Sequence, residues 1–217
     1  MWTVDVNDIA IYVIYYVCFL FALSFHEAAH GAIAYRCGDP SAKMLGRVTL
    51  NPLAHIDPIG TVLLPILLAV SRSGFVFGWA KPVPYNPRNL RNQRRDPVLI
   101  ALAGPVSNLL IAAFFVGVSR ILVTSIDAGI LPAQPELVYL FLISMITINM
   151  VLAFFNIIPV PPLDGHHVLM YFLPISGQRA LERIGPFGIL IAVIAARPLF
   201  RLLAPLFDAV QSFALPL

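Results

Sequence analysis

Long apolar runs dominate the chain and are separated by short stretches rich in proline, glycine and charge. The first run begins at Ile9, passes Phe25 and continues without a helix breaker until Gly38 and Pro40. Three further runs follow, Val98–Thr124, Leu137–Ile158 and Ile184–Leu215. About 20 apolar residues in a helix cross the hydrocarbon of a bilayer, so the pattern predicts an all-α polytopic membrane protein with about four to five transmembrane helices. Two arginines and two prolines interrupt the last run, which leaves open whether it crosses once or twice.

Two smaller elements are expected between the first two long runs. Ile59–Val70 is apolar but short and contains Pro65. We therefore expect a re-entrant segment, which enters the membrane and returns to the same side. Met44–Leu50 contains β-branched residues and is followed by turn-forming residues, which predicts a short strand or small β-hairpin.

Composition narrows the class of protein. Hydrophobic residues make up 59% of the 217 residues and charged residues only 12%, against about a quarter charged in a soluble domain. This excludes a water-soluble globular protein. We expect one integral-membrane domain over 1–217, with its core at 9–173 and a C-terminal helix or helices at 184–215. The net charge of +3 is spread over loops, so the expected surroundings are a lipid bilayer and no nucleic acid.

The charged loops predict the orientation of the chain. Lys81 and four arginines precede Asp96 in the loop before the second long run, and basic loops of this kind stay in the cytoplasm. The connection that carries Asp127 and Glu136 has no Lys or Arg. We therefore expect that connection, and the N-terminus, on the outside.

A charged motif lies inside the first apolar run. His26, Glu27 and His30 form the pattern HExxH, in which two imidazoles one helical turn apart can share a metal ion while the glutamate accepts a proton from water. Ionisable groups within an apolar helix are costly to insert into a bilayer and mark functional sites. The motif therefore predicts a metal-dependent hydrolytic site rather than a packed histidine pair.

A hydrolytic zinc site also needs a third protein ligand and an open position. Asp164 is the strongest candidate, because Pro159, Pro161 and Pro162 precede it and force the backbone out of the helix at the end of an apolar run. Non-helical backbone at membrane depth is tolerated only where protein buries it or where it lines a watery cavity. The sequence thus predicts a polar site at this point.

Topology decides whether the HExxH motif and Asp164 can meet. The motif lies near the Arg36 end of its helix, and Asp164 follows the end of Leu137–Ile158. Both reach the same side of the membrane if Ile59–Val70 does not span, because two crossings then separate them. The site is then expected near the cytoplasmic side, where the basic loops lie.

Three motifs occur in order along the apolar segments. They are HExxH at 26–30, AGPVSN at 103–108 and NIIPVPPLDG at 156–165. Together they resemble the site-2 protease family of intramembrane zinc metalloproteases, over residues 20–170. The stretches GDPSAKMLGRVTLNPLAHIDPIG and FGWAKPVPYNP are similar to the compact prokaryotic branch of that family, which lacks a PDZ domain, and imply a prokaryotic cell membrane.

The resemblance implies a zinc-dependent protease. It implies that His26, His30 and Asp164 bind Zn²⁺ and that Glu27 activates the zinc-bound water. The implied function is cleavage of the transmembrane helix of single-pass membrane proteins. Two other functions stay open: a non-proteolytic zinc-containing scaffold that binds transmembrane helices, against which the presence of Glu27 argues, and a transporter, which would not need the HExxH spacing.

Three asparagines are secondary candidates. The resemblance implies that Asn156, and Asn108 as a further candidate, bind the substrate backbone or the developing oxyanion. Asn149 lies seven residues before Asn156 and so shares its helix face. Hydrogen bonding between helices is the alternative role for all three.

The Met44–Leu50 strand has two alternative roles. It is expected either to capture an unwound substrate by edge pairing or to be a plain connecting hairpin. The roles of His55, His166 and His167 stay open.

Overall fold

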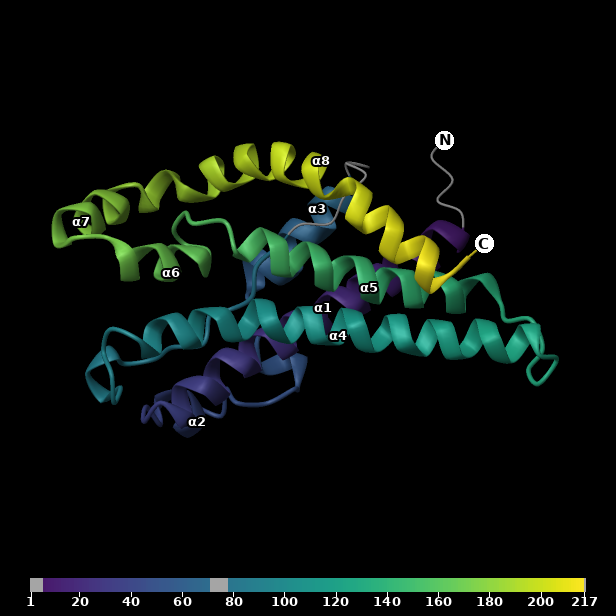
Figure 1. The fold of residues 1–217 in the computed structure, drawn as a ribbon, viewed down its shortest axis with the longest axis horizontal. Coiled ribbons are helices and arrows are strands. Elements are labelled where there is room, and N and C mark those ends of the chain that lie inside the picture. The colour runs from purple at the N-terminus through teal and green to yellow at the C-terminus, as the bar shows by residue number, and fades with distance from the viewer. Residues whose placement is uncertain (1–5, 71–77, 217) are drawn as a thin grey trace.

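The computed structural model describes residues 6–70 and 78–216 and is built from helices (Figure 1). The helices are α1 (Val6–Arg36), α2 (Ser41–Met44), α3 (Leu64–Val70), α4 (Asp96–Asp127), α5 (Glu136–Asn156), α6 (Gly165–Phe172), α7 (Ile175–Arg183) and α8 (Gly188–Ala214). The long helices α1, α4, α5 and α8 run along the molecule in alternating directions (Figure 1). These four are long and apolar enough to cross a membrane, which confirms the predicted all-α architecture.

Local sequence explains where α1 ends and α4 begins. After α1, Gly38 adopts φ +109°, a conformation that favours glycine, and Asp39 N–H donates back to a carbonyl in the last turn. Before α4, the Asn92 side chain accepts hydrogen bonds from the N–H groups of Arg94 and Arg95. Both helices therefore end in the same region of loops, at the end of the molecule where α2 lies (Figure 1).

The C-terminal apolar run forms one continuous helix, α8, and not two half-helices. Pro198 and Pro205 lie inside it, and each removes one backbone hydrogen bond of the helix. The ribbon of α8 bends along its course (Figure 1), as proline-containing helices do.

The predicted strand or hairpin over Met44–Leu50 is wrong. The described residues contain no β-strand, and this region holds α2 followed by turns. Asp39 explains the difference, because its carboxylate accepts hydrogen bonds from the backbone N–H and the hydroxyl of Ser41 and so favours a helical turn there. Gly46, at φ +66°, then turns the chain before Val48. The edge-pairing role predicted for this strand is withdrawn with it.

The short apolar segment after α2 returns to the place where it starts. A π-helical turn, Pro58–Leu63, continues into α3, and together they are too short to span a bilayer. The flanks of the segment join through backbone hydrogen bonds, from Trp79 N–H to Gly60 O at 3.3 Å and from Lys81 N–H to His55 O at 2.9 Å. A re-entrant segment requires this geometry, and its depth in a bilayer stays a prediction.

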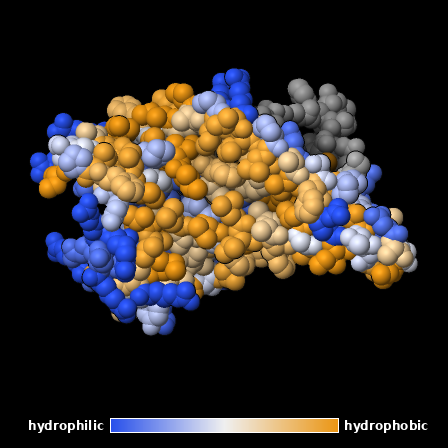
Figure 2. Space-filling view, viewed as in Figure 1, coloured by the Kyte–Doolittle hydropathy of each residue, from blue (hydrophilic) through white to orange (hydrophobic). Residues whose placement is uncertain are grey.

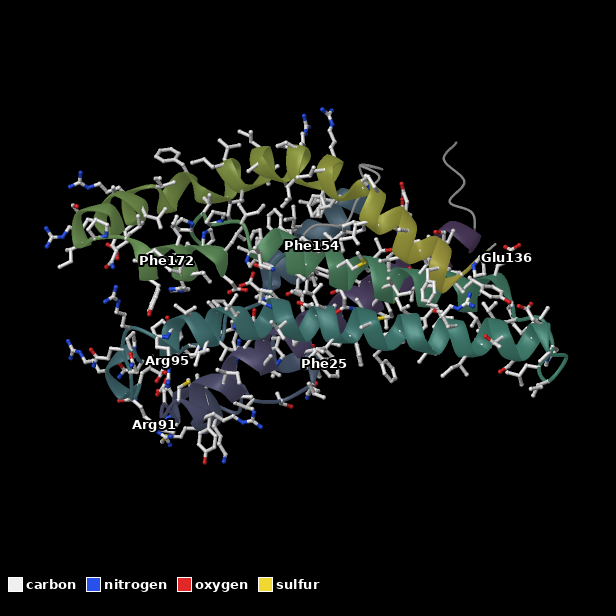
Figure 3. All side chains as sticks on the ribbon, in the orientation of Figure 1. Phe25, Arg91, Arg95, Glu136, Phe154 and Phe172 are labelled. Carbon is white, nitrogen blue, oxygen red and sulfur yellow. The ribbon has the colours of Figure 1, made fainter. Side chains whose placement is uncertain are left out.

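Apolar side chains cover the middle of the molecule. Figure 2 shows a broad hydrophobic surface, with hydrophilic residues gathered most densely at one end. Arg91 and Arg95 lie at that end, and Glu136 lies at the other (Figure 3). Between the helices, α4, α5 and α8 share an apolar core that includes Leu142, Ile146 and Phe207. Four apolar helices with this surface define an integral membrane protein.

Candidate metal centre

Three potential metal ligands from distant parts of the chain meet inside the bundle. His26 Nε2 lies 3.1 Å from Asp164 Oδ2, and His30 Nε2 lies 3.4 Å from the same oxygen. The ligand atoms of all three residues lie within 4.8 Å of one another. His26 and His30 are buried, one turn apart on α1, whereas Asp164 directly precedes α6. The proline-rich segment after α5 therefore delivers a carboxylate to the histidine face of α1.

Hydrogen bonds fix both imidazole rings. His26 Nδ1 lies 2.6 Å from Asn108 Oδ1, and His30 Nδ1 lies 2.6 Å from the Ile100 carbonyl oxygen. Each oxygen accepts, so each ring carries its proton on Nδ1 and turns the lone pair of Nε2 towards Asp164. A hydrogen-bonded Nδ1 of this kind orients metal-binding histidines.

The centre has the electronic character of a cation site. Two Nε2 lone pairs face Asp164 Oδ2, which is buried and has no hydrogen-bond partner of good geometry. Two imidazole nitrogens and a carboxylate oxygen that converge in a buried place need a positive charge among them, and a bound cation supplies it. Two imidazole nitrogens and one carboxylate oxygen are a donor set that suits catalytic zinc and leave a fourth position open.

A buried polar network extends from His26 into the bundle. Asn108 Nδ2 donates to Asn149 Oδ1 at 2.8 Å and to the Ala22 carbonyl at 3.2 Å. Asn149 Nδ2 donates in turn to the Met145 carbonyl at 2.7 Å. Asn108 and Asn149 are both fully buried. Their amide groups therefore join α1, α4 and α5 at the level of the centre and hold Asn108 Oδ1 towards His26.

Gly104 lets α4 lie against the histidines. A Cβ atom at this position would overlap ring atoms of both His26 and His30. Any other residue would thus push α4 away from α1 or displace the two rings. Gly104 belongs to the AGPVSN motif, and its role in that motif is to provide space.

An extended loop segment holds Glu27. The Glu27 carboxylate accepts a hydrogen bond from Val83 N–H at 2.9 Å. Pro82 and Pro84 flank Val83, and because proline has no N–H and favours extended backbone before it, Val83 presents the single N–H of this tripeptide. The loop after the re-entrant segment therefore reaches the HExxH motif.

Further hydrogen bonds fix this segment at both ends. The Arg47 guanidinium donates to the carbonyl oxygens of Lys81 and Pro82. At the other end Asp39 accepts hydrogen bonds from Asn86 N–H at 2.7 Å and from the Asn89 side chain at 2.8 Å. The loop that contacts Glu27 is thus tied to residues on both sides of α2.

The Asp39 carboxyl group is ionised because of its hydrogen bonds. Burial acts to raise its pKa, but hydrogen bonds from Ser41, Asn89 and Asn86 outweigh burial and hold the pKa below its ordinary value. Asp39 is fully buried. Its charge therefore depends on the loop conformation that it stabilises.

Two histidines and a tyrosine lie beside Asp164. The rings of His166 and His167 are 3.8 Å apart, and Tyr85 lies 6.2 Å from His167. Burial, together with neighbouring His166, lowers the pKa of His167 to about 4, so this ring is neutral at pH 7. Burial and the negative charge of Asp164 raise the pKa of the Tyr85 hydroxyl.

The remaining candidate residues from the sequence are not part of the His-His-Asp cluster, and each has its own hydrogen-bond partners. Asn156 Nδ2 donates to the Leu152 carbonyl within α5 at 2.9 Å, and its predicted contact with substrate stays a prediction. His55 Nε2 bonds the Thr49 carbonyl in the loop after α2. Asn108 has its amide oxygen on His26 and its nitrogen on Asn149, which is hydrogen bonding between helices, and its contact with substrate stays a prediction.

The sequence analysis missed two groups of the site. Val83 acts through a backbone N–H, for which no side-chain signature exists, although its two flanking prolines were visible. Gly104 acts through the absence of a Cβ, and only its place one turn before Asn108 in AGPVSN pointed to it.

Comparisons with known proteins identify the family of the chain. The family model of Peptidase family M50 matches residues 125–196. The chain is 36% identical over 179 residues to the protein named "Putative zinc metalloprotease YwhC" of Bacillus subtilis (strain 168), covering 82% of this chain and 77% of that protein. It is 28% identical over 187 residues to the protein named "Putative zinc metalloprotease Rip2" of Mycolicibacterium smegmatis. This match covers 86% of this chain and 67% of that protein. No solved structure matches the chain.

The fold and the relatives together define the class of protein. The structure has four helices that are long and apolar enough to cross a membrane and a His-His-Asp cluster, and the related sequences are named as zinc metalloproteases. The chain is an integral membrane protein of the metalloprotease class. It belongs to peptidase family M50, the site-2 protease family, whose members depend on zinc.

Proposed function

We propose that this protein is an intramembrane protease that cleaves the transmembrane helix of single-pass membrane proteins. The observation that carries the proposal is the convergence of His26, His30 and Asp164 Oδ2, with both imidazole Nδ1 atoms already held by acceptors. This arrangement lies inside a bundle of apolar helices, so a substrate reaches it from the bilayer.

We assign His26, His30 and Asp164 as the zinc ligands. The lone pairs of the two Nε2 atoms and the unpartnered Asp164 Oδ2 fit this role. When bound, zinc supplies a Lewis acid that polarises the scissile carbonyl and lowers the pKa of the attacking water. Asn108 and the Ile100 carbonyl keep the two imidazoles in the required tautomer.

Glu27 is the general base of the proposed mechanism. It follows His26 directly on α1, and it lies close enough to His30 to interact with it electrostatically. The N–H of Val83 holds one side of the carboxylate as an acceptor. Glu27 takes a proton from the attacking water and delivers it to the leaving amine, so the peptide bond breaks with its protons balanced.

We further propose that the site lies near the cytoplasmic side of a prokaryotic cell membrane. Arg91 and Arg95 belong to the densely charged end of the molecule, opposite Glu136 (Figure 3). Basic loops are retained in the cytoplasm. The HExxH motif lies in the half of α1 that leads to that end.

The decisive experiment measures cleavage and zinc content side by side. The purified wild-type protein, Glu27→Gln, Asp164→Ala and the charge-matched control Glu136→Gln are incubated with a panel of single-pass membrane proteins in lipid nanodiscs. We expect wild type and Glu136→Gln to cleave, Glu27→Gln to retain zinc but lose cleavage, and Asp164→Ala to lose zinc as well.

Each alternative outcome has a defined meaning. A wild-type protein that binds zinc but cleaves no member of a broad panel would favour the non-proteolytic scaffold. Cleavage that persists in Glu27→Gln would refute the assigned base. Undiminished zinc in Asp164→Ala would refute the third ligand.

A further inference from the structure

A cavity opens directly beside the candidate metal centre. Its volume is about 300 Å³, and it lies between the first half of α4, the chain segment after α5, and α6. The residues that form its walls include Leu102, Pro105, Ile157, Asp164, Val168 and Leu169. Apart from Asp164, these side chains are apolar.

Asp164 joins the cavity to the centre. Asp164 is one of the residues that line the cavity, and its carboxylate lies 3.1 Å from His26 Nε2. A peptide bond held at the centre therefore has an adjacent side chain next to the cavity mouth. The cavity therefore adjoins the proposed site of reaction at Asp164.

The chemistry of the walls selects the kind of side chain that fits. A charged or amide side chain would lose its hydration among Leu102, Pro105 and Leu169 without gaining a hydrogen bond. Glycine or alanine would leave most of the cavity unfilled and forgo the contacts that filling it provides. A leucine- or phenylalanine-sized side chain fills it and removes apolar surface from water or lipid headgroups.

We propose that this cavity is the specificity subsite of the protease and binds one large apolar side chain of the substrate next to the scissile bond. The inference rests on the proposed function, because it needs a peptide held at the centre. Val168 and Leu169 on α6 set the depth of the subsite, and Leu102 and Pro105 on α4 form its opposite wall.

The proposal predicts the effect of two substitutions on α6. Val168→Phe fills the cavity, and Leu169→Ala enlarges it. Met170→Phe is the matched control, because Met170 lies on the same helix but does not line the cavity. The three variants therefore decrease the cavity volume, increase it and leave it unchanged, respectively.

Binding of small hydroxamates tests the subsite without any known substrate. Acetohydroxamate reaches only the metal, whereas peptide hydroxamates add a glycine, leucine or phenylalanine side chain beside it. Affinities are measured for the zinc-loaded protein by calorimetry, in detergent and in lipid nanodiscs. We expect wild type and Met170→Phe to bind the leucine compound about tenfold to a hundredfold more tightly than the glycine compound.

The variants should change this preference and nothing else. We expect Val168→Phe to bind the glycine and leucine compounds equally and Leu169→Ala to shift preference towards phenylalanine, with acetohydroxamate affinity unchanged in both. Equal affinities in wild type, or a leucine preference that survives in Val168→Phe, would overturn the subsite. A preference present in detergent but lost in nanodiscs would assign the cavity to a lipid acyl chain and overturn it as well.

The same measurements separate the subsite from the proposed function. Acetohydroxamate that binds without any side-chain preference leaves the metal centre intact and overturns the subsite alone. If no compound binds, acetohydroxamate included, the proposed protease centre fails and the subsite fails with it.

Discussion

Asn108 and Gly104 lie one turn apart on α4, and both act on His26, but in opposite ways. Asn108 must present an oxygen to His26, and Gly104 must present no side chain at all. Neither is a proposed ligand. The geometry of the centre therefore depends on α4 as much as on the HExxH motif of α1.

Removing the Asn108 amide should weaken zinc binding. In Asn108→Ala the His26 Nδ1–H loses its acceptor, and loss of such an outer partner typically costs about 10- to 100-fold in metal affinity. We expect a decrease of that size in a competition titration with a zinc-selective dye. Asn156→Ala is the control and should leave zinc affinity unchanged, because the Asn156 side chain donates its hydrogen bond to the Leu152 carbonyl within α5. Equal effects of the two substitutions would contradict the positioning role of Asn108.

Adding one methyl group at Gly104 should be more harmful than adding it elsewhere on the same helix. Gly104→Ala places a Cβ against both imidazole rings, whereas Gly117→Ala meets no atom within 4 Å. We expect Gly104→Ala to lose at least tenfold in zinc affinity and to lower the unfolding temperature. Gly117→Ala should be neutral or stabilising, since alanine has the higher helix propensity. Zinc content and thermal unfolding measured on both variants check this.

Side-chain chemistry determined how much of the site was visible in the sequence. HExxH and the proline-flanked Asp164 stand out because ionisable residues are rare in apolar segments, and the structure brings them together. The acceptor of His30 is a backbone carbonyl, and the donor to Glu27 is a backbone N–H. Backbone groups are present at every position, so only the fold reveals which of them are used.

The loops after α1 are organised by one buried carboxylate. Asp39 accepts hydrogen bonds from Ser41, on one side, and from Asn86 and Asn89, on the other. The Asp39–Ser41 hydrogen bonds outweighed the local β-propensity at Met44–Leu50. The sequence did not reveal that Asp39 is buried and held in place there, because its other partners, Asn86 and Asn89, lie more than forty residues away. The long helices were predictable because twenty-residue apolar runs leave no such competition.

Asp39 should make stability depend on acid pH. Its pKa in the folded protein lies below the ordinary value, so its contribution to folding is complete above the unfolded pKa of about 3.9 and disappears as pH falls through the lowered folded pKa. The unfolding temperature of wild type should exceed that of Asp39→Asn near pH 6, and the gap should close towards pH 2. Asp127→Asn, at an exposed carboxylate near the other end, should show no such gap. A gap that is independent of pH would contradict the argument.

Two arginines on α8 should oppose the insertion of this helix into the membrane. Arg197 and Arg201 are exposed on this helix, and an arginine at the centre of a spanning helix costs about 2.5–3.5 kcal/mol to insert. We expect Arg197→Leu and Arg201→Leu to increase the membrane insertion of α8 markedly, as measured by glycosylation mapping of a reporter fusion. Arg179→Leu, on α7, should have no comparable effect. Unchanged insertion would mean that α8 holds its arginines at the membrane surface.

The proposed zinc ligands come from two parts of the chain that are far apart in sequence. The ligands lie on α1 and directly before α6, while α1, α4 and α5 also contact one another through buried asparagines. The asparagine contacts join α1, α4 and α5 without a metal. Asp164 contacts α1 through His26 and His30, at the proposed zinc site. Metal removal should therefore loosen the α6 region before it loosens the bundle.

Chelation should lower the thermal stability of the wild-type protein. A ligand that binds only the folded state stabilises it by about 2.7 kcal/mol at a free concentration one hundred times its Kd. We expect a zinc chelator to reduce the unfolding temperature of wild type by several degrees and to have little effect on Asp164→Ala. Hydrogen exchange should rise first in α6. A wild-type unfolding temperature that is the same with and without the chelator would contradict a ligand role for Asp164.

The position of Asp164 also bears on how a cell makes this protein safely. His26 and Glu27 leave the ribosome early, but the carboxylate that completes the cluster belongs to the last third of the chain. A growing chain therefore holds only two of the three proposed ligands, His26 and His30, while α4 and α5 are still being inserted. Under the proposed function, proteolytic capacity arises only when synthesis is nearly finished, so a chain that ends before Asp164 lacks the third proposed ligand and has no means of cutting its neighbours in the membrane.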